Sequence, residues 1–327
     1  MADLALSILD LAPVRHGETP RESFETSVAL ARLAEDAGYL RVWYAEHHNM
    51  PAIASSATSV LIAHVAAQTE RIRLGAGGVM LPNHSPLVIA EQFGTLAALH
   101  PGRIDLGLGR APGSDRSTMY ALRRSPASAD TFPQDVLELQ GYFSDESRVP
   151  GVHAYPGRGS QVPLYILGSS LFGATLAAAL GLPYAFASHF APAALHEAVA
   201  AYRRDFQPSE QLQQPYVIAG VNVIAADTQA DADEQFHRAK RARVRALARP
   251  GLRLTDDQVD AVLSSPEGAQ IEQMLRYSAV GRPTEIREYL ENFAKSADAD
   301  ELIVALQSPA ADARLHSAQL LATEMIG

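Results

Sequence analysis

Residues 55–110, SSATSVLIAHVAAQTERIRLGAGGVMLPNHSPLVIAEQFGTLAALHPGRIDLGLGR, carry the pattern that decides the fold. A helical stretch (55–69) precedes a short apolar run (72–77), and a second helical stretch (86–99) precedes a second run (103–108). Helical patterns that alternate with short apolar runs are typical of βα units. We therefore expect an α/β protein with a parallel sheet.

The same alternation extends outward to both ends of the chain. Eight apolar runs are predicted strands: 4–10, 41–45, 72–77, 103–108, 163–167, 184–187, 216–225 and 301–305. Helices are predicted at 20–37, 55–69, 86–99, 130–142, 169–180, 191–205, 228–246, 283–295 and 310–324. An open doubly wound sheet more often has about five to seven strands and a recognisable nucleotide-binding first turn. Eight strands with following helices favour a closed (β/α)8 TIM barrel.

Two segments interrupt this rhythm within a single predicted domain, 1–327. Residues 143–162 are rich in Gly, Pro and Ser, and residues 247–282 contain the polar tract LTDDQVD. Both are predicted insertions. The second is long enough to form a mobile lid over the mouth of a barrel.

The composition excludes several classes of protein. The chain is 47% hydrophobic and carries a net charge of −10, so its surface would repel nucleic acid. The longest basic cluster, HRAKRARVR (237–245), is interpreted as a solvated helix face. The absence of cysteine excludes disulfides, thiolate zinc sites and cysteine nucleophiles. With no apparent secretion signal and no apolar run long enough for a membrane span, a cytoplasmic location is expected.

Chemistry in such a barrel lies at the C-terminal ends of the strands. Polar or glycine residues follow the second to sixth predicted strands there: Glu46, His47 and His48; Gly77, Gly78 and His84; Arg110; Gly168, Ser169 and Ser170; and His189.

The histidines among these residues can be catalytic or merely structural. For His47 both roles are open, whereas a structural role is expected for His84 and His189. Glu46 is expected to orient a neighbour or to pair with an arginine. No metal site is predicted from Glu46, His47 and His48, because adjacent residues of a strand project to opposite faces.

Arg110 and the serines point to a phosphate. GLGRAPG (107–113) departs from the dinucleotide fingerprint because Pro112 replaces its third glycine. Arg110 is either a surface residue of a flexible loop or a fixed positive charge for a phosphate. Ser169 or Ser170 would cap the following helix, whose first amides form an anion site. Together they favour a phosphorylated cofactor.

Three segments together resemble the bacterial-luciferase-like flavin monooxygenases: WYAEHHNM (43–50), residues 55–115, and LGSSLFGATLAAALGLPYAFASHFAP (167–192). The resemblance implies a TIM barrel that binds FMN, supplied in reduced form by a separate flavin reductase. It further implies a homodimer that uses O2 to oxidise a small organic substrate.

The resemblance also assigns roles to residues. His47 matches the catalytic histidine of the family, and Gly77 and Gly78 match a pair joined by a cis peptide bond behind the flavin ring. The cofactor-binding residues that it implies are Gly77, Gly78, Arg110, Gly168, Ser169 and Ser170.

The match leaves alternatives open. Luminescent members have a cysteine where this chain has Gly109, so light emission is not expected. Related barrels use the deazaflavin F420 for hydride transfer, and some relatives bind flavin without turnover. The identity of the substrate is not predicted.

Overall fold

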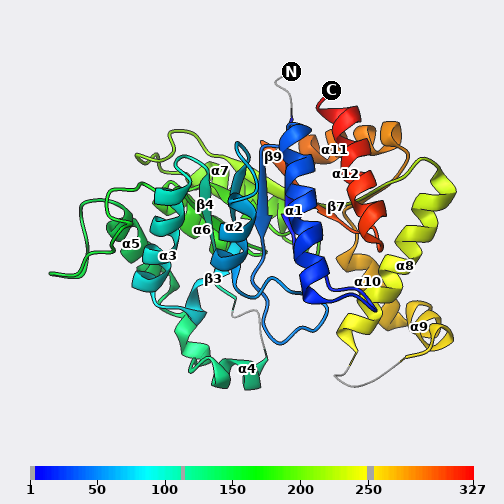
Figure 1. Cartoon of the computed structure of the whole chain (residues 1–327), viewed down its shortest axis with the longest axis horizontal. Coiled ribbons are helices and arrows are strands. Elements are labelled where there is room, and N and C mark those ends of the chain that lie inside the picture. The colour runs from blue at the N-terminus through cyan, green and yellow to red at the C-terminus, as the bar shows by residue number, and fades with distance from the viewer. Residues whose placement is uncertain (1–3, 112–114, 249–253) are drawn as a thin grey trace.

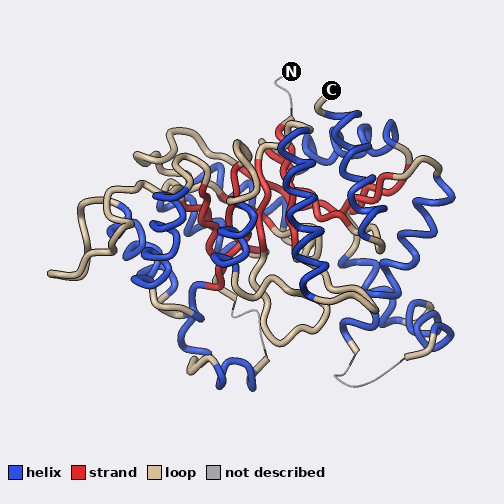
Figure 2. The backbone as a smooth tube through the Cα atoms, viewed as in Figure 1, coloured by secondary structure: helices blue, strands red, loops and turns tan. Residues whose placement is uncertain are grey.

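The computed structural model describes residues 4–111, 115–248 and 254–327. Parallel strands form a central barrel that helices surround, as Figures 1 and 2 show. The strands are β1 (Ala5–Asp10), β2 (Arg41–Tyr44), β3 (Arg73–Met80), β4 (Ile104–Gly109), β5 (Leu164–Gly168), β6 (Tyr184–Phe186), β7 (Val217–Ala225), β8 (Ser278–Gly281) and β9 (Glu301–Leu306).

The helices that follow these strands cover the outside of the barrel. They are α1 (Pro20–Asp36), α2 (Thr58–Ala66), α3 (Pro86–Leu99), α4 (Arg116–Ala121), α5 (Phe132–Phe143), α6 (Leu171–Leu180), α7 (Leu195–Asp205), α8 (Gln229–Leu247), α9 (Asp256–Leu263), α10 (Pro266–Met274), α11 (Pro283–Ala297) and α12 (Ala311–Met325). Two short 3-10 helices are η1 (Leu81–Asn83) and η2 (Pro126–Ala129). The chain termini lie at one end of the molecule, and α4 and α9 lie at the other (Figure 1).

The barrel closes through eight strands in the order β1-β2-β3-β4-β5-β6-β7-β9, with β9 paired back to β1. This confirms the predicted (β/α)8 TIM barrel and its eight strands. The prediction missed β8, which pairs only with the second half of β7, beyond the three residues that pair with β6. It also missed the short helices α4, α9 and α10.

The two predicted insertions differ in structure. Residues 144–162 form turns and irregular backbone, whereas most of 247–282 is regular, with α9, α10 and β8. The polar tract 254–260 begins α9, where Thr255 and Gln258 form a reciprocal capping box. Residues 249–253 lie outside the described part of the chain.

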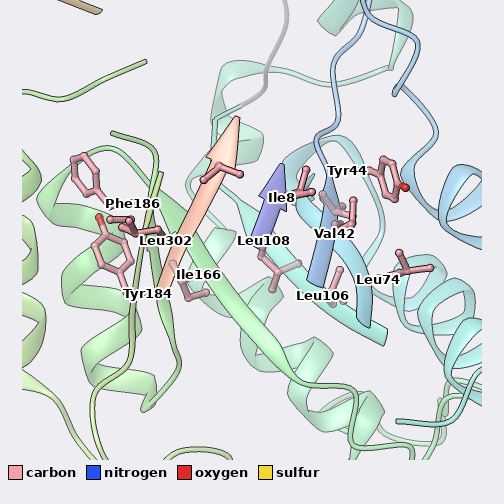
Figure 3. Close-up of a cluster of buried hydrophobic side chains, with 14 of the residues drawn as sticks. Ile8, Val42, Tyr44, Leu74, Leu106, Leu108, Ile166, Tyr184, Phe186 and Leu302 are labelled. Atoms are coloured by element: carbon pink, nitrogen blue, oxygen red, sulfur yellow. The ribbon is translucent and has the colours of Figure 1, made fainter. Parts of the chain in front are cut away.

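Side chains of the barrel strands alternate between two apolar layers. The outer layer packs against the helices and includes Ile8, Val42, Leu74, Leu106 and Ile166, all fully buried (Figure 3). The inner layer fills the barrel itself with Leu9, Trp43, Tyr165, Ile218 and Ile303. This inner layer closes the barrel beneath the C-terminal strand ends, where a site can form.

An ion network closes the N-terminal end of the barrel; we call Arg41, Arg73, Asp105 and Glu301 the basal ion network. Arg41 donates to Asp105 at 2.8 Å and to Glu301 at 3.2 Å, and Arg73 also pairs with Asp105. Burial alone would lower the pKa of Arg41, but Glu301 and Asp105 outweigh it and raise that pKa. The charges at this end are therefore compensated within the protein.

Among the described residues, none of the helices has the length and apolar character that a membrane span requires.

Candidate active site

A cavity of about 550 Å³ lies at the C-terminal ends of the barrel strands. Its size falls within the roughly 300–1,000 Å³ of ordinary small-molecule sites. Much of its wall is apolar, with Trp43, Phe132, Phe186 and Ile303 among the lining residues. Every predicted site residue also lines it: His47, Gly77, Gly78, Arg110, Gly168, Ser169 and Ser170.

His47 lies on the loop after β2. Its backbone N–H donates to the carbonyl of Ser55 at 3.2 Å, and an antiparallel bridge between Pro13 and Ile53 ties this loop to the one after β1. The Nδ1 atom of His47 is buried and has no hydrogen-bond partner in the described part of the chain. Burial lowers the pKa of His47, with Glu46 acting in the opposite direction. The imidazole is therefore predominantly neutral at neutral pH.

Glu46 lies just behind the cavity wall and holds its neighbours in place. Its carboxylate accepts hydrogen bonds from His48 at 2.7 Å, from His84 at 2.9 Å and from the backbone N–H of Met80 at 2.9 Å. Burial alone would raise the pKa of Glu46, but the hydrogen bonds from His48 and His84 lower it to about 2. The expected orienting role of Glu46 and the structural role of His84 are confirmed, and the partners of Glu46 are histidines, not an arginine.

A glycine pair in β3 forms part of the wall. The peptide bond between Gly77 and Gly78 is cis, as the resemblance predicts. A Cβ atom on Gly77 would lie 2.8 Å from the Cβ of Trp43, and one on Gly78 would lie 2.7 Å from the carbonyl oxygen of Gly107. Because neither position has room for a side chain, bare backbone borders the cavity here.

Arg110 and the start of α6 meet at the same rim. The Arg110 guanidinium lies 4.1 Å from the ring centre of Phe172, in the first turn of α6, and its Nε donates to the carbonyl of Ala129 at 3.2 Å. Ser170 is the N-cap residue, as predicted, but its side chain accepts no hydrogen bond from the helix. A helix start leaves its first amides without intrahelical partners, so this rim is suited to an anion. Pro112, part of the GLGRAPG motif, lies outside the described residues.

His189, which the sequence placed at a strand end with an expected structural role, also lines the cavity. A Cβ on Gly220 would lie 2.3 Å from the Nδ1 of His189, so the ring packs directly on that glycine. Burial, together with the nearby Arg243 and His47, lowers the pKa of His189 to about 3. The structural role expected for His189 is therefore incomplete, because its side chain also lines the cavity.

Arg243 is a cavity residue that the sequence did not single out. It belongs to the basic cluster 237–245 that was interpreted as a solvated helix face, and for Arg243 this interpretation is wrong, since it lines the cavity. Its neighbours Arg241 and Arg245 instead pair with acidic residues of α9. The available signal was helical spacing: Arg243 lies four residues after Ala239 and seven after Phe236, on an apolar stripe.

The comparisons with known proteins agree with this geometry. The family model of luciferase-like monooxygenases matches residues 5–303. The chain belongs to this family. A luciferase-like monooxygenase of Escherichia coli strain K12 is 51% identical over 320 residues, which cover 97% of this chain and 96% of that protein. The crystal structure of apo-MsnO8 is 37% identical, with a TM-score of 0.88 and 98% of both chains covered.

More distant structures share the fold of this luciferase-like protein. The FMN complex of the oxygenating constituent of 3,6-diketocamphane monooxygenase from Pseudomonas putida is 17% identical, with a TM-score of 0.73 and coverage of 98% and 97% of the two chains. An F420-dependent secondary alcohol dehydrogenase is 15% identical, with the same TM-score and 99% of both chains covered. These likenesses concern the barrel alone.

Among the residues that the structure describes, no group of three or more His, Cys, Asp or Glu side chains is arranged to hold a metal ion.

Proposed function

We propose that this luciferase-like protein binds reduced FMN and uses O2 to oxidise a small organic substrate. One observation carries the proposal: His47 and Arg110 follow two different strands and the Gly77-Gly78 peptide lies within a third, yet all line one cavity. FMN combines a phosphate with a flat ring, and the cavity offers an anion site at one rim and bare backbone along another wall. When bound, reduced FMN supplies the electrons for the reaction with O2.

In this proposal the phosphate is held by Arg110 and the first turn of α6. The guanidinium supplies a permanent positive charge, and the helix start supplies backbone N–H donors. Gly168, Ser169 and Ser170 are small residues that let the phosphate approach the backbone closely. Gly77 and Gly78 leave space against which the ring can lie flat.

His47 is the residue that we assign to proton transfer. Its Nδ1 is enclosed, so Nε2 is the ring nitrogen left to exchange a proton with a ligand in the cavity. A neutral imidazole can accept a proton, and histidine is the residue type whose ordinary pKa lies closest to neutral pH. The apolar wall around His47 excludes water from the site.

The proposal also includes the partners that the family resemblance implies. A separate flavin reductase supplies the reduced FMN in the cytoplasm, and the protein acts as a homodimer. Adding a purified reductase with its reductant should sustain turnover that neither protein supports alone, and light scattering should give twice the mass of the chain.

Anaerobic binding of reduced FMN, followed by rapid mixing with O2 and monitoring of absorbance, tests the division of roles. We expect His47→Ala to retain its affinity for reduced FMN and to slow the oxidation step. Arg110→Ala should weaken binding by about 10- to 100-fold, the usual loss for a charged hydrogen bond. Arg71→Ala, an exposed arginine before β3, is the matched control and should change neither quantity.

Three results would contradict the proposal. Equal loss of affinity in the His47 and Arg110 variants would remove the division of roles. Binding of F420 in place of FMN would favour hydride transfer. Oxidation of bound reduced FMN at the rate of the free cofactor, with no product formed, would indicate a flavin-binding protein without catalysis.

A further inference from the structure

The ionic side chains that line the cavity are all of one sign. Its described lining residues include two arginines, Arg110 and Arg243, and no aspartate or glutamate. The chain as a whole carries a net charge of −10, so this concentration of positive charge runs against the overall composition. FMN has a single phosphate group, and in the proposed function Arg110 and α6 bind it. One arginine is left over.

Arg243 has no partner of its own. In the described part of the chain it makes no hydrogen bond and no ion pair, although it is partly buried. Burial lowers the pKa of Arg243, yet an arginine side chain stays protonated in proteins. A desolvated charge without a partner is unfavourable, and an anionic ligand would offset that cost.

The topology separates Arg243 from the phosphate rim. Arg110 follows β4 and α6 follows β5, whereas Arg243 lies on α8, which follows β7. In the ring of eight strands β7 lies four positions from β3 in either direction, so α8 approaches the mouth from the side opposite the Gly77-Gly78 peptide. A ring lying on the glycine pair would leave its other face toward α8.

The surroundings of Arg243 define the kind of anion that fits. His47 and His189 share the cavity with it, and burial lowers the pKa of both imidazoles, so Arg243 is the permanent positive charge on this side. Three apolar side chains, Met50, Ile53 and Phe190, also line the cavity. One guanidinium pairs well with one planar carboxylate through two parallel hydrogen bonds.

We propose that Arg243 binds the carboxylate of the substrate, which is an organic acid with an apolar body that occupies the remaining cavity. The inference rests on the proposed function for its account of FMN. It adds a recognition residue and a substrate class: a monoanionic carboxylate, oriented with its charge at α8 and its apolar part toward the centre of the barrel.

Octanoate and 1-octanol are suitable probes because they share the apolar chain and differ in charge. Calorimetric titration of the FMN-loaded protein should give an affinity for octanoate at least about tenfold above that for 1-octanol. Arg243→Gln should abolish this preference and leave the affinity for 1-octanol unchanged. Arg243→Lys should retain part of the preference. Arg238→Gln removes an exposed arginine of the same helix and should behave as the unchanged protein.

The affinity of each variant for FMN is measured in parallel, which separates the two proposals. Equal affinities of the unchanged protein for octanoate and 1-octanol would overturn the carboxylate site. So would a loss of FMN affinity in Arg243→Gln as large as that in Arg110→Ala, because Arg243 would then bind the cofactor. If FMN fails to bind but the preference for octanoate persists, the carboxylate site stands and the flavin function fails.

Discussion

The two ends of the barrel handle buried charge in opposite ways. At the N-terminal end, Arg41 is enclosed with Asp105 and Glu301, and the basal ion network satisfies its own charges. At the C-terminal end, Arg110 and Arg243 line a cavity without any acidic residue among its described lining. The same residue type is thus compensated by the protein at one end and left available for ligands at the other.

The presence or absence of an acidic partner distinguishes a structural arginine from a ligand-binding one more clearly than the degree of burial does. A buried arginine between two carboxylates has no capacity left for a ligand, however strongly its pKa is shifted. A half-buried arginine without a partner has all of its donors available. The comparison predicts large losses of stability from substitutions of charges that the protein compensates and small ones from substitutions of charges that it leaves without a partner.

Substitution of Arg41 by Met should cause the largest loss in the free energy of unfolding. It leaves Glu301 buried without a cation and Asp105 with Arg73 alone, and breaking a buried ion pair from one side costs about 3–5 kcal/mol. Urea unfolding at neutral pH measures the loss. Arg21→Met removes an exposed arginine paired with Glu25 and should leave the midpoint unchanged. A loss below about 1 kcal/mol for Arg41→Met would show that the network does not compensate its charges.

Glu46→Gln tests a compensated charge at the functional end, with a smaller effect that depends on pH. The folded protein lowers the pKa of Glu46 from 4.5 to about 2. The carboxylate therefore stabilises the fold above pH 4.5, and this contribution disappears as the pH falls toward 2. We expect the variant to lose on the order of 3 kcal/mol at pH 6.

Urea unfolding of both proteins between pH 2 and pH 6 measures this difference. It should shrink steadily below pH 4.5, since the unchanged protein loses the contribution that the variant lacks throughout. Glu25→Gln, at an exposed position of α1, serves as control. A difference that stays constant over this range would mean that the ionised form of Glu46 contributes nothing to stability.

Much of the fold could be predicted because the local sequence pattern of each strand and helix agrees with its place in the barrel. The apolar runs and helical stretches repeat from residue 4 to residue 324, and each strand that closes the barrel is buried on both faces. β8 escaped prediction because Ser278–Gly281 (SAVG) is not a continuous apolar run and pairs along one edge. Its place depends on the second half of β7, and no local pattern encodes that pairing.

The candidate site could be predicted in part for a related reason. His47, Arg110 and Ser170 directly follow strands, and the barrel brings strand ends together wherever they occur in the chain. Arg243 lies in the middle of a long helix, more than fifteen residues after the end of β7. Only the packing of α8 over the mouth brings it to the cavity, so its position reflects tertiary structure more than sequence pattern.

Arg243→Gln should have the smallest effect on stability. Whether it lowers or raises the free energy of unfolding tests the contrast between the two ends of the barrel. In the ligand-free protein no ion pair among the described residues is broken, and a partly desolvated charge is removed, so the free energy of unfolding should change by less than about 1 kcal/mol or rise. Arg41→Met, also at an interior arginine, should lose several times as much. Urea unfolding without ligand measures the stability of both variants, with Arg238→Gln as control.

If Arg243→Gln instead lost more than about 2 kcal/mol, a value typical of a broken buried interaction, Arg243 would be compensated by the protein itself. The cavity would then have no charge to spare for a carboxylate, and the contrast between the two ends of the barrel would disappear.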